Sequence, residues 1–90
     1  TIGIVGGGQL GRMLATAAAG MGYKTHIFTP EKDAPAAHVA TKTTIGAYQD
    51  ATALRAFGQS VDVVTFEFEN VPSETLSMLS QVVSVRPGPE

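Results

Sequence analysis

A short apolar run that ends at three consecutive glycines decides the fold of this chain: Ile2-Gly3-Ile4-Val5-Gly6-Gly7-Gly8-Gln9-Leu10-Gly11. A continuous apolar run bounded by glycines is typical of a strand buried on both faces of a parallel sheet. After the glycines, apolar residues recur at the spacing of an amphipathic helix. The stretch therefore predicts a strand over 2–5, a tight turn and a helix over about 9–20, whose inner face includes Met13 and Met21.

Outward from this stretch, strands and helices alternate along the whole chain. Cap residues Asp50 and Ser73 predict the starts of two helices, and Gly58 predicts the end of the first. Five strands joined through helices by short links imply right-handed crossovers. We therefore expect an α/β fold with a doubly wound parallel sheet of five strands in the order 3-2-1-4-5. The strands after the first are predicted over 25–28, 42–45, 61–68 and 82–85, with a short helical turn over 35–40.

In such a sheet, the strand order reverses between strands one and four, and ligands bind beyond the carboxyl ends of the strands at that point. Two segments are predicted to meet there, the glycine loop Gly6–Gly11 and the segment Glu67–Asn70. Glu67 and Glu69 share a face if the strand stays extended. Paired carboxylates can perform acid–base or metal chemistry, but we favour a loop or cap role for Glu69 and ligand binding for Glu67.

The glycine loop fits the pattern G-x-G-x-x-G in the context that gives the pattern meaning, after a strand and at the start of a helix. Gly6 allows a tight turn, Gly8 allows close approach of a ligand, and Gly11 lets the helix pack against the sheet. The N–H groups and the positive dipole end at the helix start favour a phosphate. Arg12 either neutralises that phosphate or is an ordinary exposed arginine, and a tight turn without a ligand is the alternative for the whole loop.

A nicotinamide dinucleotide would need an acidic residue about 20 positions after the loop, at the end of the second strand. That strand ends in Thr29-Pro30, and Glu31 lies past the proline, so its carboxylate is expected to point away. An NAD(P)-binding domain of an oxidoreductase remains the alternative function. A small ligand-sensing or interaction module without chemistry is the third hypothesis.

The composition limits the function further. Ninety residues are enough for one domain, and a formal net charge of −2 provides no basic surface for nucleic acid or anionic membranes. The chain has no cysteine and two isolated histidines, so we expect no structural metal.

No apolar run approaches the ~20 residues that a membrane span needs, and the expected location is cytoplasmic. Both ends look cut, which suggests a domain taken from a longer chain.

Three blocks of residues carry a family resemblance that spans nearly the whole chain. They are GGGQLGRML at 6–14, DAPAAHVA at 33–40 and TFEFENVP at 65–72. In this order and at these separations, they resemble the N-terminal domain of the 5-(carboxyamino)imidazole ribonucleotide synthetases, the PurK family of ATP-grasp ligases. One departure is Thr29, because similar sequences often have an acidic residue before the proline.

The resemblance implies a ligase of purine biosynthesis that carboxylates 5-aminoimidazole ribonucleotide with ATP and bicarbonate. Residues 1–90 would then be a single Rossmann-like pre-ATP-grasp domain. The resemblance implies ribonucleotide contacts at Gln9, Leu10 and Glu67, and the glycine loop itself adds Gly8 and Gly11 at the helix start. No catalytic residue and no metal ligand is expected in this chain. The resemblance places the ATP and Mg²⁺ sites in central and C-terminal domains outside it, so we expect the chain alone to be inactive and the full-length protein to be a homodimer.

Overall fold

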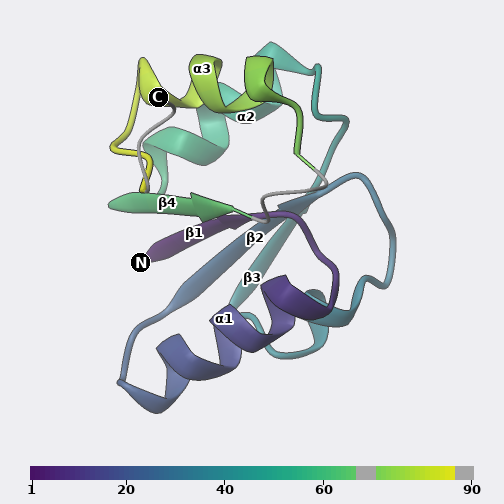
Figure 1. Cartoon of the computed structure of the whole chain (residues 1–90), viewed down its shortest axis with the longest axis vertical. Coiled ribbons are helices and arrows are strands. Elements are labelled where there is room, and N and C mark those ends of the chain that lie inside the picture. The colour runs from purple at the N-terminus through teal and green to yellow at the C-terminus, as the bar shows by residue number, and fades with distance from the viewer. Residues whose placement is uncertain (67–70, 87–90) are drawn as a thin grey trace.

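The computed structural model of the chain describes residues 1–66 and 71–86. Figure 1 shows a sheet between two helical layers, with α1 on one face and α2 and α3 on the other. The fold is therefore α/β, as the sequence predicts. The strands are β1 (Ile2–Val5), β2 (Thr25–Thr29), β3 (Lys42–Ile45) and β4 (Val63–Phe66), and the helices are α1 (Gln9–Gly20), the 3-10 helix η1 (Pro35–His38), α2 (Ala51–Gln59) and α3 (Ser73–Ser80).

The sheet has four strands in the order β3-β2-β1-β4, and every neighbouring pair is parallel. This order confirms the prediction for the first four strands. β1 lies in the interior, with Ile2 beside Thr25 of β2 and Val63 of β4. Because the strands are parallel, their carboxyl ends meet at one edge of the sheet, which is where the turn after β1 begins.

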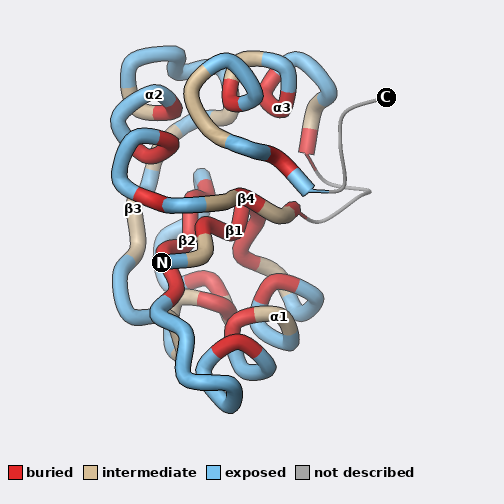
Figure 2. The backbone as a smooth tube through the Cα atoms, turned by 90° about the vertical axis from the view of Figure 1, so that its left-hand side faces the viewer, coloured by how far each residue is buried: buried red, intermediate tan, exposed pale blue. Residues whose placement is uncertain are grey.

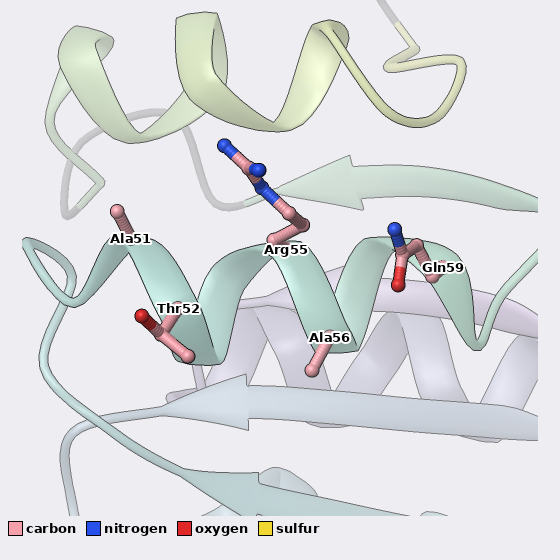
Figure 3. Close-up of a pocket in the computed structure, with 5 residues that line it drawn as sticks. All are labelled: Ala51, Thr52, Arg55, Ala56 and Gln59. Atoms are coloured by element: carbon pink, nitrogen blue, oxygen red, sulfur yellow. The ribbon is translucent and has the colours of Figure 1, made fainter.

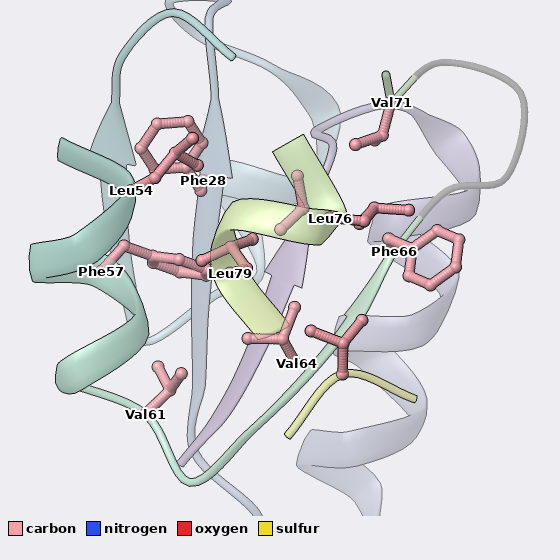
Figure 4. Close-up of a cluster of buried hydrophobic side chains, with 11 residues drawn as sticks. Phe28, Leu54, Phe57, Val61, Val64, Phe66, Val71, Leu76 and Leu79 are labelled. Carbon is pink, nitrogen blue, oxygen red and sulfur yellow. The ribbon is translucent and has the colours of Figure 1, made fainter. Parts of the chain in front are cut away.

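The hydrophobic core lies on both faces of the sheet, because neighbouring residues of a strand point to opposite sides. Ile4 and Ile27 pack beneath α1, whereas Val5 and Phe28 pack beneath α2 and α3. The second cluster is the larger of the two, and Figure 4 shows its side chains between α2, α3 and the sheet. Its other buried members are Leu54, Phe57, Val61, Val64, Phe66, Val71, Leu76, Leu79 and Val85.

Helix α2 begins after the predicted cap residue Asp50, but it does not end at the predicted residue Gly58. The Asp50 carboxylate accepts a hydrogen bond of 3.1 Å from the Ala53 N–H, which satisfies a free donor of the first turn. Gly58 lies inside the helix rather than closing it, and a Cβ at this position would lie 2.6 Å from Val82 Cγ2. Gly58 is therefore a point of close approach to the segment that follows α3, and the prediction of a glycine stop was wrong.

The segment 82–85 makes a single parallel bridge, between Val85 and Val64 of β4, rather than a fifth strand. The N–H groups of Val82 and Val83 both donate to the Leu79 carbonyl at 3.0 Å, so the chain is still turning out of α3. Only the last residues reach the sheet, where Arg86 N donates to Val64 O at 2.7 Å. The predicted fifth strand is not confirmed, although the bridge lies on the expected side of β4.

The start of α3 also differs from the prediction. Ser73 is the first helical residue, and Pro72 occupies the cap position without a side-chain hydrogen bond. The Pro72 carbonyl accepts from the N–H groups of Thr75 and Leu76 at 3.1 and 3.5 Å. Proline at the boundary is compatible with a helix start because its fixed backbone angle leads into the first turn.

Helix α1 presents a different face to the sheet from the one predicted. Its buried residues are Gly11, Ala15 and Ala18, whereas Met13 and Met21 are 67% and 69% exposed. Small residues allow the helix axis to approach the sheet closely, and the large methionines are then directed outward. The prediction that both methionines pack in the core was wrong.

Among residues 1–66 and 71–86, no helix is long and apolar enough to cross a bilayer.

A buried histidine links β2, β3 and the end of α2. The His26 side chain is 4% exposed, and its Nδ1 and Nε2 lie 3.1 Å from Ser60 Oγ and 2.6 Å from Thr44 Oγ1. Because the Ser60 hydroxyl donates to the Phe57 carbonyl at 2.7 Å, Ser60 Oγ is left to accept from His26 Nδ1–H. Thr44 then donates to Nε2, and the neutral ring is fully hydrogen-bonded. Burial, and to a lesser degree the nearby Lys42 charge, lowers the pKa of His26 below its usual value.

Candidate functional site

The turn between β1 and α1 is built from backbone geometry that glycine permits. Gly6 has a φ of 107°, which side chains disfavour, and its N–H donates to the Phe28 carbonyl at 2.8 Å. Gly8 is the N-cap of α1, and its carbonyl accepts from Arg12 N at 2.9 Å. The chain therefore leaves the interior strand and enters a helix within three residues, at the carboxyl edge of the sheet.

Gly7, in the middle of this turn, is packed too tightly to carry a side chain. A Cβ added there would lie 2.6 Å from Ala34 Cβ and 2.9 Å from Thr29 Oγ1. The Gly7 carbonyl also accepts a hydrogen bond of 2.9 Å from Ala36 N. The end of β2 and the start of η1 therefore pack against the turn and fix its position.

The supporting segment 29–38 is itself well fixed. Ala34 and Ala36 are 1% and 0% exposed, and Asp33 adopts a left-handed φ of 57° that turns the chain toward the glycines. Asp33 Oδ1 lies 2.9 Å from His38 Nε2, at the far end of η1. This support was not predicted from the sequence. The available signal was the run of small residues around Pro35, because only small side chains can pack this closely behind a glycine turn.

The start of α1 is suited to an anion. Its N-cap provides no side-chain hydrogen bond, and its first turn has no acidic residue. The first N–H groups of a helix have no partner within the helix, and they coincide with the positive end of the helix dipole. Arg12, which is exposed in the same turn, is the only charged residue of α1. The local field therefore favours negative charge, although the chain as a whole is slightly acidic.

The structure places four of the five predicted contact residues together at this turn. Gly8 is partly exposed and Gln9 is exposed, as is Leu10 at 43%, so a ligand can reach all three. Gly11 is buried, so its contribution is the close packing of α1 on the sheet. Glu67 lies outside the described residues.

The ends of β1 and β4 are aligned at the same edge of the sheet. Val5 is paired with Phe66, so the residue before the glycine turn lies beside the last residue of β4. This register supports the predicted position of the crevice, because the two strands flank the reversal in strand order. Glu67 and Glu69 follow Phe66 in the sequence, and both fall outside the described residues.

A separate hollow of about 430 Å³ lies along the outer side of α2. Figure 3 shows the five residues that line it, with the Arg55 side chain pointing toward α3. The lining comes from one exposed helix face, and α2 lies across the sheet from α1. None of the four predicted contact residues that the structure describes lines this hollow. The remaining lining residues are Ala51, Thr52, Ala56 and Gln59.

Comparison with known proteins supplies relatives with stated activities. The chain is 57% identical over 90 residues to the bifunctional purine synthesis protein purC/E of Dictyostelium discoideum. This match covers all of this chain and 9% of that protein. It is 51% identical over 89 residues to the N5-carboxyaminoimidazole ribonucleotide synthase of Brucella melitensis, covering 99% of this chain and 25% of that enzyme. The chain thus spans a quarter or less of the length of these relatives.

A solved structure provides a relative with bound ligands. It is the N5-carboxyaminoimidazole synthase of Aspergillus clavatus in complex with ADP and 5-aminoimidazole ribonucleotide. The TM-score is 0.83 at 29% identity, over 98% of this chain and 24% of that one. The family model for the ribonucleotide synthetase preATP-grasp domain matches residues 1–90, and the chain therefore belongs to the family of ribonucleotide synthetase preATP-grasp domains.

Proposed function

We propose that this chain is the ribonucleotide-binding domain of an N5-carboxyaminoimidazole ribonucleotide synthetase. The full-length enzyme would carboxylate 5-aminoimidazole ribonucleotide with ATP and bicarbonate in purine biosynthesis. The observation that carries the proposal is the likeness over 98% of this chain to the Aspergillus clavatus enzyme, which was solved with ADP and that ribonucleotide. The glycine turn, with its anion-favouring helix start, gives the chain a place to bind the substrate.

The part that this chain plays is to bind and orient the substrate. The 5′-phosphate would accept hydrogen bonds from the N–H groups between Gly8 and Gly11, with the helix dipole favouring its charge. Gln9 and Leu10, whose side chains are exposed at the turn, would contact the rest of the ribonucleotide. Glu67 would accept hydrogen bonds from ribose or amine groups. Because the turn packs against Ala34 and is hydrogen-bonded to Ala36, it would need little rearrangement on binding.

ATP and Mg²⁺ are expected outside this domain, because the family resemblance implies that their sites lie in the central and C-terminal domains. No lysine lies in the glycine turn or in α1, and the described residues include no group of three potential metal ligands. We therefore assign both to the rest of the full-length enzyme, together with the carboxylation chemistry. Residues 1–90 would form one domain, and this domain by itself would have neither ATPase nor carboxylation activity. By the same resemblance, we infer that the full-length enzyme is a cytoplasmic homodimer.

The alternative, an NAD(P)-binding domain, finds less support in the geometry. Thr29 ends β2 and is fully buried, and its Oγ1 accepts from Glu31 N at 3.2 Å. Glu31 itself is exposed beyond the strand end, and the segment around Ala34 packs against the glycine turn. An acidic residue positioned for the adenosine ribose is therefore missing from the end of β2. Calorimetric titration that detected micromolar NAD or NADP binding would favour this alternative.

Steady-state kinetics of the full-length protein test the assignment of Glu67. Losing one hydrogen bond to a charged acceptor costs about 1.5–3 kcal/mol. Glu67→Ala should therefore raise the ribonucleotide KM roughly ten- to a hundredfold and leave the ATP KM nearly unchanged. Glu31→Ala, which removes an exposed carboxylate just beyond the end of β2, is the control and should change neither KM. An unchanged ribonucleotide KM in the Glu67 variant, or a defect confined to ATP, would contradict the assignment.

A further inference from the structure

The contact between Gly7 and Ala34 lies on the inner side of the glycine turn. Both residues are buried, and a Cβ added to Gly7 would lie 2.6 Å from the Ala34 methyl carbon. Among the described residues, Gly6 and Gly22 are the glycines with positive φ, so the backbone of Gly7 itself would accept alanine. The close fit at position 7 therefore arises from its neighbours, the Ala34 methyl group and Thr29, whose Oγ1 would lie 2.9 Å from the added Cβ.

The position of Ala34 is fixed by the residues that follow and precede it. Asp33 turns the chain with a φ of 57°, a conformation that aspartate adopts more readily than most other side chains. The Ala34 carbonyl accepts a hydrogen bond of 3.0 Å from Ala37 N at the start of η1. Ala36 N donates to the Gly7 carbonyl at 2.9 Å. The Ala34 methyl group is thus presented to Gly7 by a segment that is hydrogen-bonded both to itself and to the turn.

A displacement of Gly7 would be passed directly to the start of α1. Gly8, the next residue, is the N-cap of the helix, and Gln9 is its first residue. Figure 2 shows that buried segments of α1 alternate with exposed ones, as expected of a helix that packs on a sheet. Because the body of the helix is held there, a shift of Gly7 would move mainly the first turn. The N–H groups of that turn are the proposed donors to the phosphate.

We propose that Ala34 is a positioning residue for the ribonucleotide, because its methyl group sets how far the glycine turn projects toward the crevice. A smaller residue at position 34 would let the turn draw back toward the end of β2, and a larger residue at position 7 would push the turn away from it. Either shift moves the donors off the phosphate, and a misplacement of about 1 Å can lower activity about a hundredfold. The inference rests on the proposed function, since it takes the ribonucleotide to bind at this turn.

Moving the methyl group from one residue to the other tests the proposal in the full-length protein. Ala34→Gly leaves a gap beside Gly7 and should raise the ribonucleotide KM about three- to tenfold, with the ATP KM unchanged. Gly7→Ala crowds the same contact and should raise the ribonucleotide KM at least as much. In the double variant the methyl group sits on residue 7 instead of residue 34. Its KM should therefore fall below that of Gly7→Ala, whereas independent effects would multiply.

Ala56→Gly is the matched control, because it makes the same change at an exposed position of α2, on the other face of the sheet from α1. Glycine inside a helix also lowers stability, so this variant separates lost stability from lost positioning, and its ribonucleotide KM should equal that of the wild type. If Gly7→Ala does not fold, Ala34→Gly and this control decide the question.

Three results would overturn the positioning role while the wild type consumes the ribonucleotide. They are an unchanged ribonucleotide KM in Ala34→Gly, equal rises in Ala34→Gly and Ala56→Gly, and fold-changes that multiply in the double variant. A wild-type enzyme that does not consume the ribonucleotide would overturn the proposed function itself, and this inference with it.

Discussion

Gly7 lies at the centre of the candidate site and is packed too closely to carry a side chain. Its missing side chain lets Ala34 and Thr29 support the turn, and its carbonyl is bonded to Ala36 N. The glycine pattern suggested that Gly8 and Gly11 matter for the ligand and the helix, but it gave Gly7 no role. Its role comes from residues that are more than 20 positions away in the sequence, which a local pattern cannot reveal.

A methyl group at Gly7 should destabilise the domain. Forcing extra volume into a well-packed site costs about 1–3 kcal/mol, so Gly7→Ala should lower the free energy of unfolding by that amount. Gly20→Ala is the matched control, because nothing lies within 4 Å of a Cβ at that position. At the end of a helix, alanine should be neutral or stabilise by up to about 1 kcal/mol. Urea unfolding followed by circular dichroism measures both, and equal effects of the two substitutions would refute the packing argument.

His26 should make the stability of the domain depend on pH. Its pKa in the folded state is lowered, first by burial and then by Lys42, so the unfolded chain takes up the proton more readily. This contribution to stability is complete above the unfolded pKa, near 6.5, and is lost as the pH falls toward the folded value. Unfolding free energies from pH 7.5 to 5 should therefore decrease less steeply in His26→Asn than in the wild type. A wild-type slope in His26→Asn would contradict this account.

At the scale of the elements, the sequence predicted where helices and strands lie better than it predicted which way they face. The bounds of α1 agree with the prediction, but the large apolar residues Met13 and Met21 were assigned to the core. Two apolar faces overlap on this helix, one of small residues and one of large residues. Periodicity cannot decide between them, because the decision depends on how closely the helix packs on the sheet. The strand predicted over 82–85 is not confirmed for a related reason. The hydrogen bonds to the Leu79 carbonyl keep the start of this segment in the turn after α3.

The cap of α2 should have a measurable effect on stability. Replacing an N-cap aspartate by alanine typically costs about 1 kcal/mol. Asp50→Ala removes the acceptor of the Ala53 N–H and should lower the free energy of unfolding by about this amount. Asp50→Asn retains a side-chain acceptor and should be close to the wild type. Thermal unfolding of the two variants distinguishes them, and equal losses would mean that the charge rather than the hydrogen bond stabilises this end.

At the scale of the whole molecule, much of the candidate site followed from the order of strands and helices. The glycine turn and the end of β4 lie at the carboxyl edge of the sheet, because parallel strands bring these ends together. The supporting segment 29–38 could not be predicted, since its position depends on packing between η1 and the turn. Glu67, outside the described residues, stays a prediction. The chain is also a quarter or less of its relatives' length, so the ATP site cannot be derived from it.

The proposed role of this domain is to bind 5-aminoimidazole ribonucleotide for a synthetase reaction. The most direct test is to measure ADP release and ribonucleotide consumption by the purified full-length protein with ATP and bicarbonate. We predict that ADP release depends on the ribonucleotide and matches its carboxylation in a ratio of about one to one, and that Gly8→Val, which blocks approach to the helix start, raises the ribonucleotide KM at least tenfold. ATP turnover that is independent of the ribonucleotide, or an unchanged ribonucleotide KM in Gly8→Val, would contradict the account.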